Sequence, residues 1–136
     1  MPSTSRARGW PSQALVEAAL VFPLLITLSL GVLQVALYAH ARDVVLSAAQ
    51  EGARLAAEDG RGLDDGYARV AELARTGLGT MVAPLETHAR LDMDVVEFTI
   101  DTALSPIVPI PLTGGLPIHV RASASRERFR PNGGAP

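Results

Sequence analysis

The residues that could perform chemistry in this 136-residue chain are few and widely spaced. His40, His88 and His119 do not share the short spacing that would bring two of them to one metal ion. Cysteine is absent, which excludes thiol chemistry and disulfides. The aspartates of residues 59–65 lack the spacing of an EF-hand loop, and no Ser–His–Asp arrangement or phosphate-binding glycine loop can be assembled. We therefore predict a protein that is not an enzyme and uses no cofactor or metal ion.

One carboxylate is unusual because of its position. Glu17 opens an apolar run, and no further Asp, Glu or Arg follows until Arg42. The residues between Glu17 and His40, about 22 of them, would span ~33 Å as a helix at ~1.5 Å per residue, close to the ~30 Å hydrocarbon core of a bilayer. A chain of this size cannot bury such a run on all sides. The run is therefore either a membrane span or a signal for export.

The arginines that flank the apolar run indicate its orientation. Arg6 and Arg8 precede it, whereas on the far side Arg42 is followed directly by Asp43. Because basic residues near a span favour the cytoplasmic side, we expect the N-terminus inside and the rest of the chain outside. Export remains an alternative, since a basic start followed by AHA at residues 39–41 fits a cleavage site. The net charge of −2, without a basic patch, gives no indication of nucleic-acid binding.

Glu17 and Pro23 each have more than one interpretation. In the first turn of a span a carboxylate can reach the headgroups, and a helix N-terminus favours an anion by ~0.3–1 kcal/mol. Glu17 is then simply an interfacial residue. Pro23 is either a proline of the kind that membrane helices tolerate or a hinge. Physical arguments alone do not decide between these interpretations and a role in assembly.

Several motifs of the sequence recur together in one known family. They are a Val-Glu pair, a proline six residues after the glutamate, a mid-span glycine, an EGAR segment and a final alternating strand, located at Val16, Glu17, Pro23, Gly31, residues 47–54 and residues 118–125. This combination resembles the TadE-like family of pilus assembly proteins, which are pseudopilins of tight-adherence (Flp-type) systems. The resemblance is closest over residues 9–57.

The resemblance implies a processing site and a docking residue. A prepilin peptidase would cut between Ser12 and Gln13, which makes Glu17 the fifth residue of the mature chain. In pilin-like proteins a glutamate at that position helps the subunit to dock beside its neighbours, and Pro23 belongs to the same motif. The implied partners are cytoplasmic membrane lipids, other pilins or pseudopilins, and membrane assembly proteins.

The elements that must position these residues follow from periodicity. The span of residues 14–40 continues as a helix over residues 42–57, and its small residues offer a helix-packing face, either for a partner or for the protein's own domain: Ala48, Ala49, Gly52 and Ala53. A break at residues 58–62 precedes a second helix that Asp64 can cap. That helix should end near Gly77 and Gly79, with Tyr67, Val70, Leu73 and Ala74 as its apolar stripe.

Two strands should follow the second helix. From Ala89 to Ile100 apolar residues alternate, and the phase shift at Val95 and Val96 suggests a bulge or a crossing between two faces. The last strand covers residues 118–125. The proline-rich segment 106–117 cannot be a central strand; it would cover the end of the hairpin, touch the bilayer surface or contact a partner.

Together these patterns predict an α+β, pilin-like fold. We expect a flexible leader at residues 1–13, a transmembrane helix at 14–40, an extracytoplasmic domain at 41–130 that ends in a small antiparallel sheet, and a flexible tail at 131–136. The predicted function is that of a single-pass, non-enzymatic, pseudopilin-like component of a Flp-type pilus assembly or secretion system in the bacterial cytoplasmic membrane. The alternatives are a secreted binding domain whose residues 1–41 are a cleaved signal peptide, and a bitopic membrane protein unrelated to pili.

Overall fold

A computed structural model describes residues 10–107 and 115–126 of the chain. It contains two helices followed by three strands: α1 (Trp10–Ala57), α2 (Leu63–Leu78), β1 (Glu86–Asp92), β2 (Val95–Leu104) and β3 (Leu116–Ser125). The strands form one antiparallel sheet in the order β1-β2-β3. The predicted α+β class, with a long N-terminal helix, a short second helix and a small antiparallel sheet, is confirmed.

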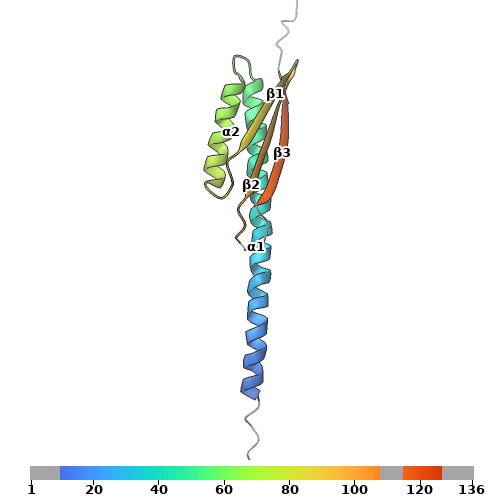
Figure 1. The fold of residues 1–136 in the computed structure, drawn as a ribbon. Helices are drawn as coiled ribbons and strands as arrows, with labels where there is room; N and C mark the ends of the chain where they lie inside the picture. Colours follow the sequence, from blue (N-terminus) through green and yellow to red (C-terminus); the bar gives the residue numbers. More distant parts are fainter. Residues whose placement is uncertain (1–9, 108–114, 127–136) are drawn as a thin grey trace, which may run out of the picture.

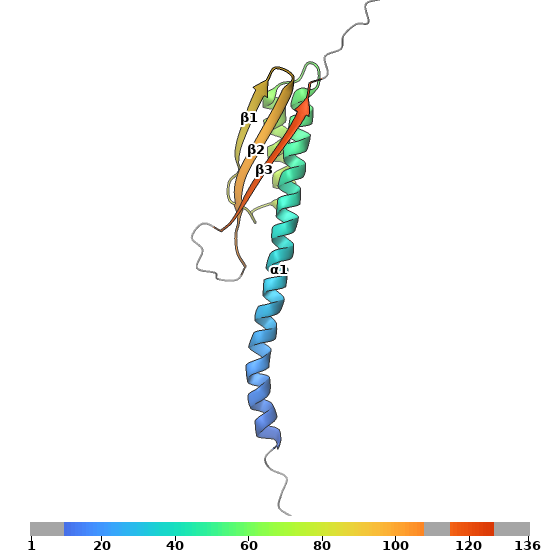
Figure 2. The same cartoon turned by 90° about the vertical axis from the view of Figure 1, so that its right-hand side faces the viewer.

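Helix α1 is a rod that is much longer than the domain it supports. Its 48 residues extend ~72 Å at ~1.5 Å per residue. α2 and the sheet pack along the second half of the rod, and the first half projects away from them (Figures 1 and 2). The helix runs through Pro23 without a break, and the Thr27 hydroxyl donates a hydrogen bond to the Pro23 carbonyl at 2.8 Å.

The hydrophobic core lies between the two helices and one face of the sheet. From Val95 to Ile100 the side chains of β2 alternate, with Val96, Phe98 and Ile100 fully buried. The cross-strand partners Phe98 and Ala122 face the helices together. The Phe98 ring also meets Tyr67 of α2 edge to face, with ring centroids 5.3 Å apart. One face of the sheet is therefore apolar and covered, as is usual for small antiparallel sheets.

The turn between the helices and the start of α2 differ from the expected capping. Gly60 adopts a φ of +77°, a left-handed conformation that glycine reaches without steric cost. α2 then begins at Leu63 with Gly62 as its N-cap residue, and Asp65 accepts a hydrogen bond from the Gly62 N–H at 3.2 Å. The prediction that Asp64 caps this helix is wrong, because the carboxylate at the third helical position reaches back to the cap. The helix ends at Leu78, before Gly79, as expected.

Of the two expectations for residues 89–100, a bulge or a crossing between two faces, the bulge is wrong, because the chain makes a tight hairpin there. β1 and β2 pair as far as Asp92 and Val95, and Met93 and Asp94 form the turn. The Asp92 carboxylate accepts the Met93 N–H at 2.9 Å, a local bond typical of aspartate in turns. Each pair joins an odd-numbered residue to an even-numbered one, so the face toward the helices changes from odd positions in β1, of which 87 and 89 are half-buried, to even positions in β2. This reversal explains the phase shift in the sequence.

The last strand starts earlier than expected and lies at the edge of the sheet. β3 begins at Leu116, and its second residue is Pro117, which pairs with Ala103 of β2. A proline is tolerated near the start of an edge strand. Of the expected proline-rich segment, residues 108–114 lie outside the described residues, as do residues 1–9 and 127–136 at the ends.

Candidate functional site

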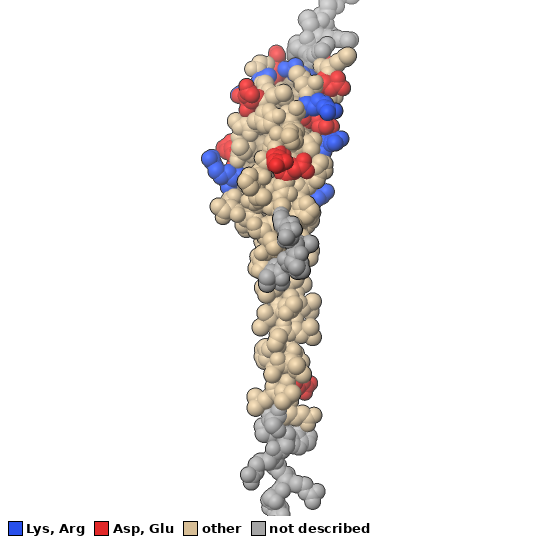
Figure 3. All heavy atoms as spheres, in the orientation of Figure 1, with Lys and Arg blue, Asp and Glu red and all other residues tan. Residues whose placement is uncertain are grey.

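The first half of α1 exposes a continuous apolar surface. Its exposed side chains include Leu15, Leu20, Leu24, Leu28 and Val35. Of the 18 most apolar consecutive residues of α1, only 6% are buried, and the helix is long and apolar enough to cross a membrane. Figure 3 shows the contrast: charged side chains gather over the domain, and the rod carries a single acidic group near its lower end. An exposed apolar surface of this extent is typical of a region that contacts a membrane or another protein.

The expected processing and docking residues all lie at the free end of this rod. α1 begins at Trp10, so the bond between Ser12 and Gln13 lies within its first turns. Glu17 is exposed on the next turn, and it forms no ion pair with any of the residues that the structure describes. Pro23 follows between one and two turns later. The structure thus brings these residues together along one stretch of helix, away from the domain.

The domain makes its first contacts with α1 near residue 34. Gln34 is only 6% exposed, although its neighbours Leu33 and Val35 are 46% and 69% exposed. Its Oε1 accepts a hydrogen bond from the Ile107 N–H at 2.7 Å. One turn further, the Tyr38 hydroxyl donates to the Pro117 carbonyl at 3.0 Å. These two bonds join the rod to the start of the β2–β3 connection and to the start of β3.

Gln34 and Ile107 form this junction, and neither residue is among those predicted from the sequence to be functional. The available signal was a lone amide between Gly31 and His40, in an otherwise apolar run. Its partner could not be found from the sequence, because 73 positions separate the two residues. The Gln34 Nε2 atom is buried and has no hydrogen-bond partner among the described residues.

The small residues of the expected helix-packing face lie inside the protein's own core. Ala48, Ala49 and Ala53 are completely buried, and Gly52 is buried beside α2. A Cβ atom added at Gly52 would lie 3.1 Å from the Gly66 carbonyl oxygen, so two glycines mark the close approach of α1 and α2. In this structure the face therefore supports the domain.

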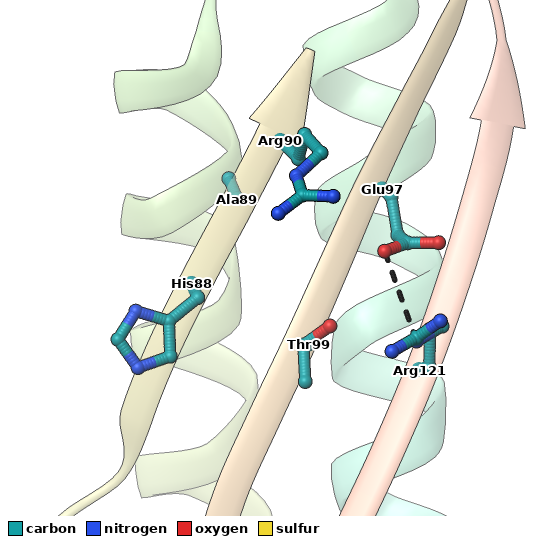
Figure 4. Close-up of a pocket in the computed structure, with 6 residues that line it drawn as sticks. All are labelled: His88, Ala89, Arg90, Glu97, Thr99 and Arg121. Atoms are coloured by element: carbon teal, nitrogen blue, oxygen red, sulfur yellow. Dashed lines mark ion pairs between the residues drawn. The ribbon is translucent and has the colours of Figure 1, made fainter. Parts of the chain in front are cut away.

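The outer face of the sheet carries a hollow lined mainly by polar side chains. Figure 4 shows His88 and Arg90 from β1, Glu97 and Thr99 from β2 and Arg121 from β3 around a depression of about 330 Å³. Arg121 and Glu97 form an ion pair at 3.7 Å, and the arginine side chain is 63% exposed. Such a solvated pair contributes little to stability.

The described residues contain no group of three or more His, Asp or Glu side chains that could hold a metal ion. His119 is paired with Asp101 at 2.6 Å on the exposed side of the sheet. His88 and His40 lie elsewhere, on β1 and α1 respectively. The expected absence of a metal site stays a prediction for the chain as a whole.

Comparison with known proteins connects the rod to one family. The family model described as TadE-like protein matches residues 13–54, which comprise the projecting half of α1 and most of the part that enters the core. The match confirms the resemblance for the motifs that lie within residues 13–54; the strand at residues 118–125 lies outside it. No curated protein and no solved structure matches the chain.

Proposed function

We propose that this chain is a membrane-anchored, pseudopilin-like component of a Flp-type (tight-adherence) pilus assembly or secretion system. It acts by helix–helix assembly and not by catalysis. The observation that carries the proposal is the exposed apolar first half of α1. The TadE-like family model matches residues 13–54 and so covers this half from residue 13 onward. A rod of this kind both anchors a subunit and offers a surface for other helices.

The energetics of the rod support an environment of lipid or neighbouring helices. Each Å² of apolar surface left in water costs about 25 cal/mol, and a Leu or Phe side chain accounts for ~1.5–3 kcal/mol when it is fully buried. Leu20, Phe22 and Leu24 are all more than 60% exposed in the isolated chain. The bilayer core covers such a helix over about 20 residues. The same side chains can then pack against other spans inside the membrane.

Glu17 is the residue proposed to set the register between neighbouring helices. Its exposed carboxylate, without an ion-pair partner among the described residues, is available to a group of another chain. Cleavage between Ser12 and Gln13 would create an α-amino group of opposite charge near the same depth. In a low-dielectric environment an unpaired charge is costly, so the two charges are stable there only as a pair. Pairing therefore fixes the position of one helix relative to its neighbour.

The junction between rod and domain argues against the secreted alternative. Signal cleavage after Ala41 requires a separable segment, but α1 is continuous across residues 39–41. Ala41 is only 1% exposed and belongs to the core. The Tyr38 hydroxyl, on the side that would be removed, is bonded to Pro117. These contacts favour a rod that stays attached.

The intact mass of the protein purified from its native membrane tests the processing step. A chain that starts at Gln13 supports a processed pilin-like subunit with Glu17 in the fifth position. An uncut chain in the membrane keeps the anchor and favours an assembly scaffold over a filament subunit. A chain that starts at Arg42 and is found outside the membrane would refute the proposal in favour of a secreted domain.

Cross-linking through a single cysteine tests helix–helix assembly, because the chain has no native cysteine. Leu24→Cys places a thiol on the exposed rod, and mild oxidation in native membranes should join it to a cysteine placed at the same depth in a second helix of the assembly. Glu17→Gln should weaken this cross-link, whereas the matched change Glu51→Gln, on an exposed domain position of α1, should not. Equal cross-linking in both variants would contradict a docking role for Glu17, and the absence of any cross-link in the parent would favour the bitopic alternative.

A further inference from the structure

The end of β2 returns to the rod at a definite level. The Ile107 N–H donates to Gln34 Oε1 at 2.7 Å, so Ile107 lies beside α1 at about residue 34. Both views of the ribbon show the end of β2 approaching α1 at the lower end of the domain, on the side of the projecting rod (Figures 1 and 2). The β1–β2 hairpin, with Met93, lies at the opposite end.

That level falls inside the thickness of a bilayer, if α1 spans the membrane as proposed above. Glu17 and Gln34 are separated by ~26 Å along the helix at ~1.5 Å per residue, and a hydrocarbon core is ~30 Å thick. With Glu17 at the cytoplasmic interface, residue 34 lies a few Å below the outer boundary. Helix side chains lean toward the N-terminus, which brings the Gln34 amide slightly deeper.

The chemistry of this segment suits an apolar surrounding. Ile107 is 52% exposed, and no charged residue occurs between Asp101 and His119. In a membrane each backbone N–H needs an internal partner. Pro106 has no N–H to satisfy, and that of Ile107 is taken by Gln34. Pro106 and Ile107 therefore present no free backbone donor to the lipid.

We propose that Pro106 and Ile107 form a second lipid contact of the protein, inserted among the acyl chains of the outer leaflet beside α1. Gln34 is the positioning residue that holds them at this depth. The inference rests on the proposed membrane anchor and extends it: because α1 is packed into the domain core, a second lipid contact beside it sets the depth and tilt of the domain at the membrane surface.

Tryptophan fluorescence in vesicles tests the contact. The full chain, with its native tryptophan removed by Trp10→Phe, carries Ile107→Trp and is reconstituted in phosphatidylcholine with brominated acyl chains. We expect a blue-shifted emission and a loss of fluorescence comparable to that of Leu24→Trp on the exposed rod. Met93→Trp, at a position 85% exposed in the distant hairpin, should show neither effect.

The reference positions separate the two ways in which the test can fail. If Leu24→Trp is quenched and Ile107→Trp is not, the lipid contact is refuted and the anchor stands. A blue-shifted but unquenched Ile107→Trp also refutes it, because a neighbouring protein surface then covers the residue. If Leu24→Trp itself is unquenched, the membrane anchor of the proposed function fails.

A second variant tests the role of Gln34. Gln34→Leu removes the acceptor of the Ile107 N–H and leaves that donor unpaired, so the segment should move toward water and the quenching of Ile107→Trp should decrease. Val35→Leu, one residue away on an exposed part of the rod, is the matched control and should leave the quenching unchanged. Undiminished quenching in Gln34→Leu would overturn the positioning role.

Discussion

The contact between α1 and α2 depends on a glycine whose replacement has two opposing effects. Gly66 lies in α2 and is buried. A Cβ atom added there would lie 2.6 Å from Phe98 Cζ, 2.8 Å from the Gly52 carbonyl oxygen and 3.0 Å from Ala56 Cβ. The carbonyl oxygen belongs to the backbone of α1 and cannot rotate away. Gly66→Ala therefore requires the two helices to separate.

The magnitude follows from comparing the two effects. Extra volume in a well-packed core costs ~1–3 kcal/mol. Alanine in place of glycine in a helix interior stabilises the helix by ~1 kcal/mol, because alanine has the higher helix propensity. Because two of the three contacts are shorter than any that real Cβ atoms make, the steric cost lies toward its upper end. We expect Gly66→Ala to lower the free energy of unfolding of the domain by about 1–2 kcal/mol, which is a factor of ~5–30 in the equilibrium constant.

Hydrogen exchange of the β2 amides, followed by mass spectrometry on the full chain in detergent micelles, measures this change. Amides of a central strand exchange through opening of the whole domain, so their rates should rise by the same factor. Gly31→Ala is the matched control, because nothing lies within 4 Å of its added Cβ. Slower exchange in Gly66→Ala than in the parent would refute the close helix contact, since only the propensity gain would then remain.

Three further substitutions test the core, the hairpin edge and the helix cap. Phe98→Ala removes a fully buried ring and should lower the free energy of unfolding by ~3–5 kcal/mol, measured by denaturation in detergent. Tyr67→Phe removes the hydroxyl that accepts the Ala89 N–H at 2.8 Å; it should cost ~1–3 kcal/mol and speed exchange of that amide. Asp65→Ala removes the carboxylate that accepts the Gly62 N–H and should cost ~0.5–2 kcal/mol in the same denaturation assay.

Each of these three substitutions has a matched control. Met93→Ala, on an 85% exposed side chain, should leave the stability within about 0.5 kcal/mol of the parent. Tyr38→Phe removes a hydroxyl whose bond is exposed and should leave Ala89 exchange unchanged. Asp64→Ala should destabilise less than Asp65→Ala; the reverse order would contradict the observed cap.

Much of the architecture could be predicted from the sequence because it depends on local periodicity. The uncharged run after Glu17 and the good helix formers beyond Arg42 predicted one long helix, and α1 is that helix. The stripe with Val70 and Ala74 predicted the second helix, in which both residues are buried. Alternation after Val96 predicted the buried face of β2. Such patterns need no knowledge of distant contacts.

The phase shift did not identify the hairpin, because a chain reversal and a bulge produce the same pattern of apolar residues in a sequence. Both shift the phase of alternation by one residue, and only the pairing of β1 with β2 distinguishes them. Leu91, Met93 and Val95, the alternating apolar residues around the turn, are 49%, 85% and 39% exposed. The two aspartates that flank Met93 are typical turn residues and could have predicted the turn from the sequence.

The sequence by itself determined that part of this protein is a helix of membrane length with an acidic residue at its start, because hydrophobicity and charge are properties of single residues. The tertiary structure decided what the remaining residues contact. It placed Gly52 against Gly66, buried the small-residue face of α1 in the core, and brought Ile107 to Gln34. These contacts join segments far apart in the chain, so their partners are defined only when the helices and the sheet have packed.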